Sequence, residues 1–483
     1  MEKVRMVDVT LRDGHQSLWA ERMTTGMMLP VMKDLDDAGF EALEVLSPSF
    51  LVKCVRELKE DPFQRIRLLK GLAKKTELRA NVGGLNVFGT DQPVMLDLFW
   101  RIMKSCGIDE VRISDSWNNP KVWKIRAQAA SKHGVKPIIN ITYSISPNHT
   151  TDYYVKCTQE AAKLKPFRLC LKDPGGLLTP ERVRELVPLM MSKAKGLEIE
   201  LHTHCSTGLG PLCVLEAVKH GIRIVNTAIP PLADDASLPS IFNVTSNLRH
   251  LGFAVDIDLT RLKPVEAHFT RIAMHEKLPI GRPVEYDYSQ YIHQVPGGMI
   301  SNLRNQLKEV GAEDKLPQAL EEAVQVRADF GYPIMVTPLS QFVGSQAAVN
   351  VMTGKRYEQV TDQSIRFALG QFGGNVEVDM NPVVREKILS SVRAKELSKE
   401  RFLVRNEDEL RADLNAKGLS DEDFLFRYLM RREDIDRMRA LNGTFKRYDG
   451  AALTLKDVLT HLSKAAKGNS VHISKPGFNI TLR

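Results

Sequence analysis

The chain has 483 residues, of which 43% are hydrophobic and 26% are charged, enough for a large core and an appended domain. Its formal net charge of +8 comes from 67 basic and 59 acidic residues that are interspersed, so nucleic-acid binding is not indicated. Six cysteines without a CxxC pair, no signal-peptide pattern and no apolar run of membrane-spanning length predict a cytoplasmic protein without direct membrane insertion.

The first 285 residues repeat one pattern, in which a short alternating apolar run is followed by an amphipathic stretch. The runs begin near Val4, Ala42, Glu77, Glu110, Lys136, Phe167, Glu198 and Ile222. Helical sequence follows them, as at Met27–Ala38 and Pro180–Ala194. Eight such units predict an α/β fold of the (β/α)8 TIM-barrel type. A doubly wound open sheet is the alternative, but no G-x-G-x-x-G follows any of the strands.

The predicted strands agree with one another in phase. In strands three, five, six and seven one alternating set is apolar, and we expect it to meet the outer helices. The polar sets are Glu77, Arg79 and Asn81; Asn140 and Thr142; Arg168, Cys170 and Lys172; and Glu200, His202 and His204. Because barrel interiors are usually apolar, polar lumenal residues at the carboxyl ends of strands indicate the catalytic face.

A change of character near residue 286 predicts a mostly helical C-terminal domain. The expected helices are Asn302–Val310, Pro317–Phe330, Val343–Val351, Asp362–Leu369 and Pro382–Leu397, separated by Gly, Pro or polar breaks. Residues 398–441 are dense in charge and are expected to form solvated helices. We therefore expect a barrel over 1–285, a helical domain over 286–440 that completes the active site, and a tail over 441–483 with strand-like pieces such as Ser470–Ser474.

Two histidines and an aspartate predict a metal site. His202 and His204 occupy positions i and i+2 of the seventh strand, so both imidazoles point into the lumen. Such a pair at the end of a barrel strand favours a metal over two core histidines with satisfied hydrogen bonds. Asp13, just past the first strand, is a candidate oxygen ligand, although an Asp before Gly is also a common turn cap.

Lys172 faces the same lumen on the sixth strand, and an ammonium cannot bind a cation. It has two interpretations, a counter-charge to Asp173 or to substrate, or a carbamate that would convert the cation into an anionic oxygen ligand. The residues alone do not choose between them.

Two arginines at the predicted ends of strands one and three, Arg12 and Arg79, suit a carboxylate substrate because each guanidinium pairs bidentately with two oxygens. Either one taken singly is as readily a structural ion pair. Gln16 and Asn81 are candidates for orienting a carbonyl group. Residues Val336–Ser340 predict a helix N-terminus with Thr337 or Ser340 as cap and Pro338 at the first turn.

Four segments together resemble the carboxyltransferase domain or subunit of biotin-dependent enzymes: pyruvate carboxylase, the α subunit of oxaloacetate decarboxylase, and the central subunit of transcarboxylase. They are Leu11–Ser17, Leu171–Leu178, His202–Gly208 and Val336–Gly344. The wider group is the hydroxymethylglutaryl-CoA-lyase-like barrel family, in which synthases typically have Glu where His15 stands and lack a lysine like Lys172.

The resemblance implies a role for each matching residue. Asp13, His202, His204 and carbamylated Lys172 would hold a divalent metal, which in this family is zinc, manganese or cobalt. Arg12, Gln16 and Arg79 would bind a small 2-oxo acid of the pyruvate or oxaloacetate type. Thr337 would move a proton between the biotin nitrogen and the substrate methyl carbon, and Ser340 would help hold the biotin ring.

Two departures and two absences complete the prediction. The run Ala80–Asn86 lacks the tyrosine that contacts biotin in the family, and Pro230–Ser237 replaces the usual loop after strand eight, so the pocket is expected to be altered.

No ATP-binding glycine-rich loop and no biotin-acceptor Met-Lys-Met are present. A separate biotin carboxyl carrier protein and a biotin carboxylase subunit are therefore expected partners, and a homo-oligomer is expected. The alternatives are a biotin-independent metal lyase or aldolase of the same barrel group, and a non-catalytic docking subunit.

Overall fold

The structure is a computed structural model. It describes residues 1–85, 91–295, 300, 303–304, 307–309, 311–374, 376–400, 402–441, 443–448, 471–475 and 478–482. Asn86, at the end of the altered run after strand three, lies outside the described residues.

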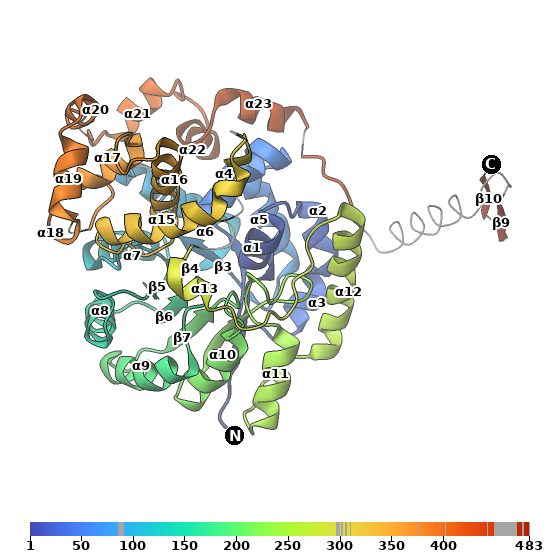
Figure 1. Ribbon diagram of the computed structural model, residues 1–483. Coiled ribbons are helices and arrows are strands. Elements are labelled where there is room, and N and C mark those ends of the chain that lie inside the picture. Colours follow the sequence, from blue (N-terminus) through green and yellow to red (C-terminus); the bar gives the residue numbers. More distant parts are fainter. Residues whose placement is uncertain are drawn as a thin grey trace.

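Eight parallel strands close into a barrel in sequence order, with the last strand pairing back onto the first (Figure 1). The strands are β1 (Arg5–Asp8), β2 (Ala42–Leu46), β3 (Glu77–Val82), β4 (Ile108–Ile113), β5 (Lys136–Thr142), β6 (Arg168–Asp173), β7 (Ile199–Thr203) and β8 (Ile224–Thr227). The predicted TIM barrel is confirmed, and the open-sheet alternative is excluded.

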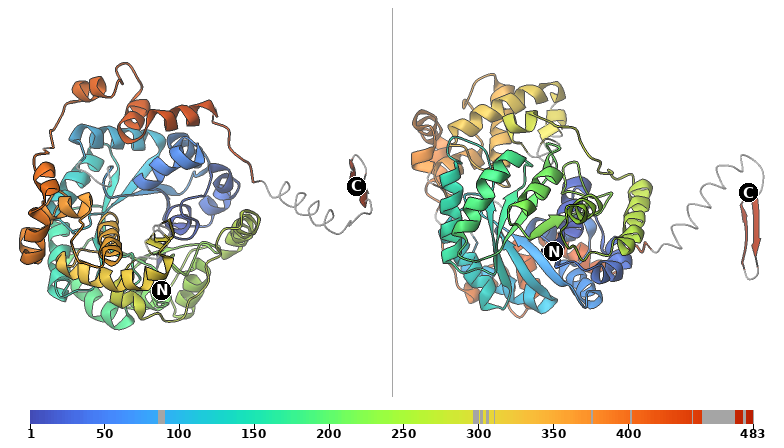
Figure 2. Two further views of the ribbon diagram at one scale, coloured as in Figure 1. Left: turned by 45° about the horizontal axis from the view of Figure 1, so that its top comes forward. Right: turned by 90° about the horizontal axis from the view of Figure 1, so that it is seen from below.

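Helices lie between the strands and after β8, and both views in Figure 2 show the longer ones on the outside of the barrel. They are η1 (Thr10–Gly14), α1 (His15–Trp19), α2 (Thr25–Met28), η2 (Leu29–Val31), α3 (Met32–Asp37), α4 (Pro48–Lys53), η3 (Cys54–Leu58), α5 (Pro62–Leu72), α6 (Pro93–Cys106), α7 (Pro120–Lys132), α8 (Thr151–Lys163), α9 (Pro180–Lys193), α10 (Gly210–Lys219), α11 (Ile241–His250) and α12 (Leu259–Glu276). The predicted stretch Met27–Ala38 is divided among α2, η2 and α3.

The predicted phase of the strands is confirmed by contacts across the barrel. Arg79 on β3 donates to Glu110 on β4 and to Glu200 on β7, so the polar set of these strands faces the lumen. Leu78 and Ala80 lie in the main hydrophobic cluster with the outer helices. The same alternation therefore produces a packed outer layer and a charged interior.

The second domain is built of helices around its own apolar cluster, which includes Phe330, Phe342 and Phe367. Its helices are α13 (Ser289–His293), η4 (Glu313–Lys315), α15 (Leu316–Asp329), α16 (Leu339–Thr353), α17 (Asp362–Ala368), α18 (Val376–Asp379), α19 (Pro382–Leu389) and α20 (Val392–Leu397). The predicted helix Pro382–Leu397 is interrupted because the Ser391 side chain accepts a hydrogen bond from Ala394 N and caps α20. Residues 302, 305, 306 and 310 of the predicted helix Asn302–Val310 lie outside the described residues.

The helical domain rests on the loops that follow β4 and β5, at the carboxyl ends of the strands. Trp117 Nε1 donates to Phe372 O over 2.9 Å, and Arg327 Nη2 donates to Ser144 Oγ over 3.0 Å. In Figure 1, α13 is seen near β4, with α15 and α16 above it. The domain thus lies over the face of the barrel where TIM-barrel active sites are found.

The charged segment after residue 400 packs against the barrel. It contains α21 (Glu407–Asp413), α22 (Asp421–Leu429) and α23 (Arg432–Ala440). In α22, Phe424, Leu425 and Phe426 are fully buried, and the Phe426 ring stacks on Phe63 of α5 at 4.8 Å between centroids. The expectation of solvated helices is therefore wrong for the face of α22 that meets α5, because a short apolar stripe lies within this otherwise charged segment.

The end of the chain forms a two-stranded antiparallel sheet, β9 (Val471–Lys475) with β10 (Phe478–Leu482). The first of these strands overlaps the predicted strand Ser470–Ser474, whose Ser470 lies outside the described residues. Across the part of the chain that the structure describes, no helix combines the length and the apolar character needed to cross a bilayer.

Candidate metal and substrate site

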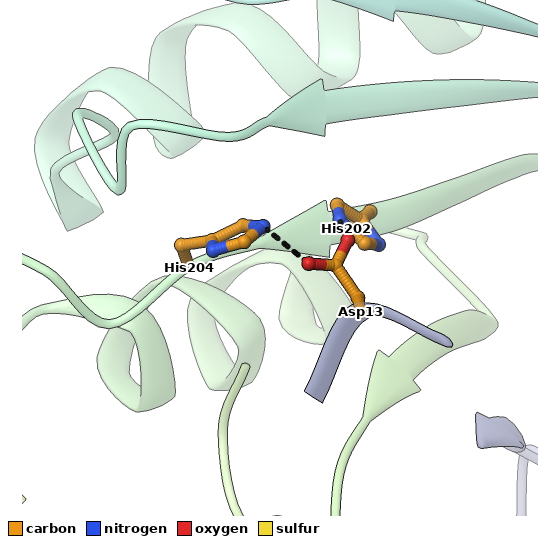
Figure 3. Close-up of side chains that lie close together, drawn as sticks. All are labelled: Asp13, His202 and His204. Carbon is orange, nitrogen blue, oxygen red and sulfur yellow. Dashed lines mark ion pairs between the residues drawn. The ribbon is translucent and has the colours of Figure 1, made fainter. Parts of the chain in front are cut away.

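Asp13, His202 and His204 come together at the carboxyl end of the barrel (Figure 3). Asp13 lies in η1, the turn directly after β1, and the histidines lie on β7 and just after it. His202 Nε2 is 3.1 Å from Asp13 Oδ2, and His204 Nε2 is 3.6 Å from Asp13 Oδ1. All three residues are buried, and one ligand atom from each lies within 4.8 Å of the others. The predicted triad is therefore formed.

The Nδ1 atom of each histidine lies within hydrogen-bond distance of an oxygen atom. His202 Nδ1 lies 3.1 Å from Asn226 Oδ1 on β8, and His204 Nδ1 lies 2.7 Å from the carbonyl oxygen of Ala236. A neutral imidazole that donates from Nδ1 keeps its Nε2 lone pair for a cation. Consistent with this, His202 Nε2 is buried and makes no hydrogen bond of normal geometry with any described residue. Ala236 belongs to the altered loop after β8, so that loop positions a candidate ligand.

The protonation states also suit a metal. Burial opposes ionisation of Asp13, but the Arg12 guanidinium and the two histidines hold its pKa well below the usual range. Burial, and next the charge of Arg112, hold the pKa of His202 well below its usual value. A carboxylate with a neutral imidazole is the state that metal binding requires. The donor set, one carboxylate oxygen and two imidazole nitrogens, fits zinc or a similar divalent transition ion.

Lys172 lies beside this triad, because it is the register partner of His202 between β6 and β7. Burial, followed by the charges of Arg112 and Arg12, lowers its pKa to about 8, and its Nζ is 3.4 Å from Ser114 Oγ. Asp173 is not its counter-charge: the Asp173 carboxylate accepts from Leu177 N and Leu178 N on the other side of the strand, each over 2.9 Å.

Arg12 lies between the triad and a buried glutamate. Its Nη2 is 2.6 Å from Asp13 Oδ2, and its Nε donates to Glu44 Oε1 over 2.5 Å. Its Nη1 donates to Gln16 Oε1 over 3.1 Å, and Gln16 is exposed. The predicted pair Arg12 and Gln16 is therefore brought together at the rim of the site.

Arg79 does not join Arg12 at the mouth of the barrel. It is the third of six residues in β3, fully buried, with Nη1 3.0 Å from Glu200 Oε1 and Nη2 2.7 Å from Glu110 Oε2. The prediction that it lies at the strand end is wrong, since β3 continues through Asn81 to Val82. The structure thus places Arg79 in a lumenal ion pair, the alternative that its sequence context left open.

Thr337 and Ser340 lie where the helical domain meets the barrel. Ser116, on the loop after β4, donates to Thr337 O over 3.2 Å. The predicted cap is wrong: α16 begins at Leu339, Pro338 occupies the cap position, and no described side chain caps the helix. Thr337 is exposed, whereas the Ser340 hydroxyl is buried and has no hydrogen-bond partner among the residues that the structure describes.

Several residues of the site were missed from the sequence. Glu44 accepts from both Arg12 and Arg112, and Ser114, just after β4, lies next to Lys172 and accepts from Asn140, which the lumenal set of strand five already contained. Asn226 holds His202. The signal that could have found them is the lumenal phase of strands two, four and eight, which lie beside the strands whose alternation was followed.

Comparisons with known proteins agree with this geometry. The family described as "Conserved carboxylase domain" matches residues 291–472, and the family described as "HMGL-like" matches residues 110–268. The carboxyl transferase domain of Rhizobium etli pyruvate carboxylase with pyruvate superimposes with a TM-score of 0.82 at 22% identity, covering 100% of this chain and 83% of that chain. This likeness shows a shared fold.

Two curated relatives are closer in sequence. A pyruvate carboxylase subunit of Methanocaldococcus jannaschii is 36% identical over 80% of this chain and 68% of its own length. The methylmalonyl-CoA carboxyltransferase 5S subunit of Propionibacterium freudenreichii subsp. shermanii is 32% identical over 79% of this chain and 76% of its own length. The chain therefore belongs to the family of biotin-dependent carboxyltransferases.

Proposed function

We propose that the chain is a metal-dependent carboxyltransferase subunit that moves a carboxyl group between carboxybiotin on a separate carrier protein and a small 2-oxo acid of the pyruvate or oxaloacetate type. The observation that carries the proposal is the buried set of Asp13, His202 and His204 at the carboxyl end of the barrel, with both Nδ1 atoms already engaged. This set suits a divalent ion with an open position for substrate.

Asp13, His202, His204 and a carbamylated Lys172 would hold the metal. When bound, a divalent ion polarises a carbonyl oxygen and favours the enolate of the substrate. Arg12 and Gln16 would bind the 2-oxo acid, because Arg12 reaches the triad and Gln16 is exposed beside it. The ion pairs of Arg79 with Glu110 and Glu200 support a structural role for that arginine instead.

Thr337 would move the proton and Ser340 would help to hold the biotin ring. Thr337 is exposed, and the hydrogen bond from Ser116 to its carbonyl oxygen fixes its backbone against the barrel. The buried Ser340 hydroxyl, which has no partner within the described part of the chain, has one donor and two lone pairs to offer a ureido group. In the carboxylating direction, carboxybiotin on the carrier would supply the carboxyl group.

A separate carrier and a separate biotin carboxylase would complete the system. The Methanocaldococcus jannaschii relative is named as one subunit of pyruvate carboxylase and not as the whole enzyme, which supports this division of labour. The sequence has no glycine-rich ATP loop and no Met-Lys-Met acceptor, which agrees with it.

The test measures metal content and biotin-dependent decarboxylation of oxaloacetate by the purified chain, with free biotin in place of the carrier. The wild type should bind about one divalent ion per chain, and His204→Ala should lose both the ion and the activity. His220→Ala, at the end of the outer helix α10, is the matched control and should keep both. Wild-type protein that binds no metal, together with an unchanged His204→Ala variant, would refute the proposal.

A further inference from the structure

We propose that Ser114 is a positioning residue that holds the side-chain nitrogen of Lys172 for the addition of CO2. The inference rests on the proposed function, in which carbamylated Lys172 is a metal ligand. Ser114 directly follows β4, where its backbone N–H donates to Val82 O over 2.9 Å, and its Oγ lies 3.4 Å from Lys172 Nζ.

The hydrogen bonds of the Ser114 hydroxyl fix its direction. Its single hydrogen is directed at Asn81 Oδ1 over 3.1 Å, and one lone pair accepts from Asn140 Nδ2 over 2.7 Å. Asn140 Nδ2 also lies 3.1 Å from Asn81 Oδ1, which makes the two amide orientations consistent. Only one lone pair remains, so Ser114 accepts from Lys172 and cannot donate to it.

This arrangement directs the reactive lone pair of the amine. When one N–H of Lys172 donates to Ser114, the nitrogen lone pair must point away from the Asn81–Ser114–Asn140 cluster. A new N–C bond to CO2 then forms on the side away from Ser114. The nitrogen loses one proton to water and keeps one hydrogen, and that hydrogen is the one that Ser114 accepts before and after the reaction.

The cluster is uncharged, unlike the surroundings of the other lumenal cations. Arg12, Arg79 and Arg112 each pair with a glutamate. Among the residues that the structure describes, no carboxylate lies within ion-pair distance of Lys172 Nζ, and Ser114 is the hydrogen-bond partner recorded for it. A neutral partner matches the N–H of a carbamate, which carries its negative charge on the carboxyl oxygens.

The experiment follows the carbamate directly. Metal-free protein is equilibrated with 13C-labelled bicarbonate, and the carbamate carbon is observed by NMR as the bicarbonate concentration is raised. The wild type should show one signal that is lost in Lys172→Ala. In Ser114→Ala, half-maximal labelling should need about fivefold more bicarbonate, the factor that corresponds to one ordinary hydrogen bond of about 1 kcal/mol.

Two further variants separate positioning from stability. Ser114→Thr keeps a hydroxyl and should restore most of the labelling. Ser364→Ala removes a buried hydroxyl in the helical domain, where Ser364 Oγ accepts from Thr361 Oγ1, and should label like the wild type.

The outcomes distinguish the inference from the function beneath it. Equal bicarbonate dependence of Ser114→Ala and the wild type would overturn the role of Ser114 and leave the carbamate intact. Absence of a carbamate signal from the wild type would overturn both this role and the four-ligand metal set.

Discussion

Arg12 and Glu44 form a buried ion pair that joins the turn after β1 to the middle of β2, with Arg12 Nε 2.5 Å from Glu44 Oε1. The same carboxylate accepts from Arg112 on β4, over 2.6 Å from Nε and 2.7 Å from Nη2. Burial opposes the charge of Glu44, but the two arginines lower its pKa, so it stays ionised. Glu44 thereby holds Arg12 at the distance from which it reaches Asp13.

Replacing Glu44 should destabilise the fold strongly. Glu44→Gln leaves two guanidinium groups in the lumen without their shared anion, a situation that typically costs about 3–5 kcal/mol. The free energy of unfolding from urea titration measures the loss. Glu57→Gln, which removes an exposed partner of Arg56, should cost less than about 1 kcal/mol. Equal losses in both variants would show that the lumenal pair is not structural.

Asn226 should control the affinity for metal although it is not a ligand. Asn226→Ala removes the acceptor 3.1 Å from His202 Nδ1, so the ring loses its fixed tautomer and orientation. The expected result is a metal affinity about 10- to 100-fold weaker, measured by competition with a chelator. Asn247→Ala on the outer helix α11 is the matched control. An unchanged affinity in Asn226→Ala would contradict the assignment of His202 Nε2 as the ligand atom.

The barrel and the triad could be predicted because both depend on short-range patterns. Alternation with period two identifies lumenal residues, and His202 and His204 share one face whatever the exact strand ends. Asp13 follows because the carboxyl ends of parallel strands meet at one rim.

Arg79 and Glu44 could not be placed from the sequence, because their roles depend on depth and register. Arg79 would lie at the mouth if β3 ended near it, but the strand continues to Val82. The role of Glu44 can be recognised only once the strand register is known, because the register aligns it with Arg79 and brings Arg12 and Arg112 within hydrogen-bond distance. The contact of the Ala236 carbonyl oxygen with His204 could not be predicted either, because any residue in a loop carries the same backbone carbonyl.

His15 should make the fold sensitive to acid. Burial, then the charges of Arg65 and Arg12, lower its pKa from 6.5 to about 3. Below about pH 6.5, His15 is therefore protonated in the unfolded chain but stays neutral in the folded chain. The free energy of unfolding consequently falls as the pH drops toward 3, by about 1.4 kcal/mol per pH unit.

The substitution His15→Gln should remove this dependence. Urea unfolding in the presence of a chelator, at about pH 8 and about pH 5.5, measures it without interference from metal. The stability of the wild type relative to His15→Gln should decrease by about 1 kcal/mol between the two conditions. His220→Gln, at the end of the outer helix α10, controls for loss of a histidine as such. A constant difference would mean that His15 titrates normally in the folded protein.

Thr337 should be required for proton transfer but not for folding or metal binding. Thr337 is exposed at the junction with the barrel and its side chain does not cap α16, so removing the hydroxyl removes no helix cap. Thr337→Ala should therefore keep the stability and metal content of the wild type. Proton transfer by a positioned side chain typically contributes about 10²- to 10⁴-fold, so the rate of carboxyl transfer should fall by that order.

The distinguishing measurement for Thr337 is exchange of the methyl hydrogens of pyruvate with deuterated water, followed by NMR in the presence of free biotin. Exchange should fall together with carboxyl transfer in Thr337→Ala and should be largely retained in Thr337→Ser, which keeps the hydroxyl. Thr353→Ala, at the far end of α16, should behave like the wild type. Retained exchange and transfer in Thr337→Ala would contradict the role of Thr337 as the group that moves the proton between biotin and the substrate methyl carbon.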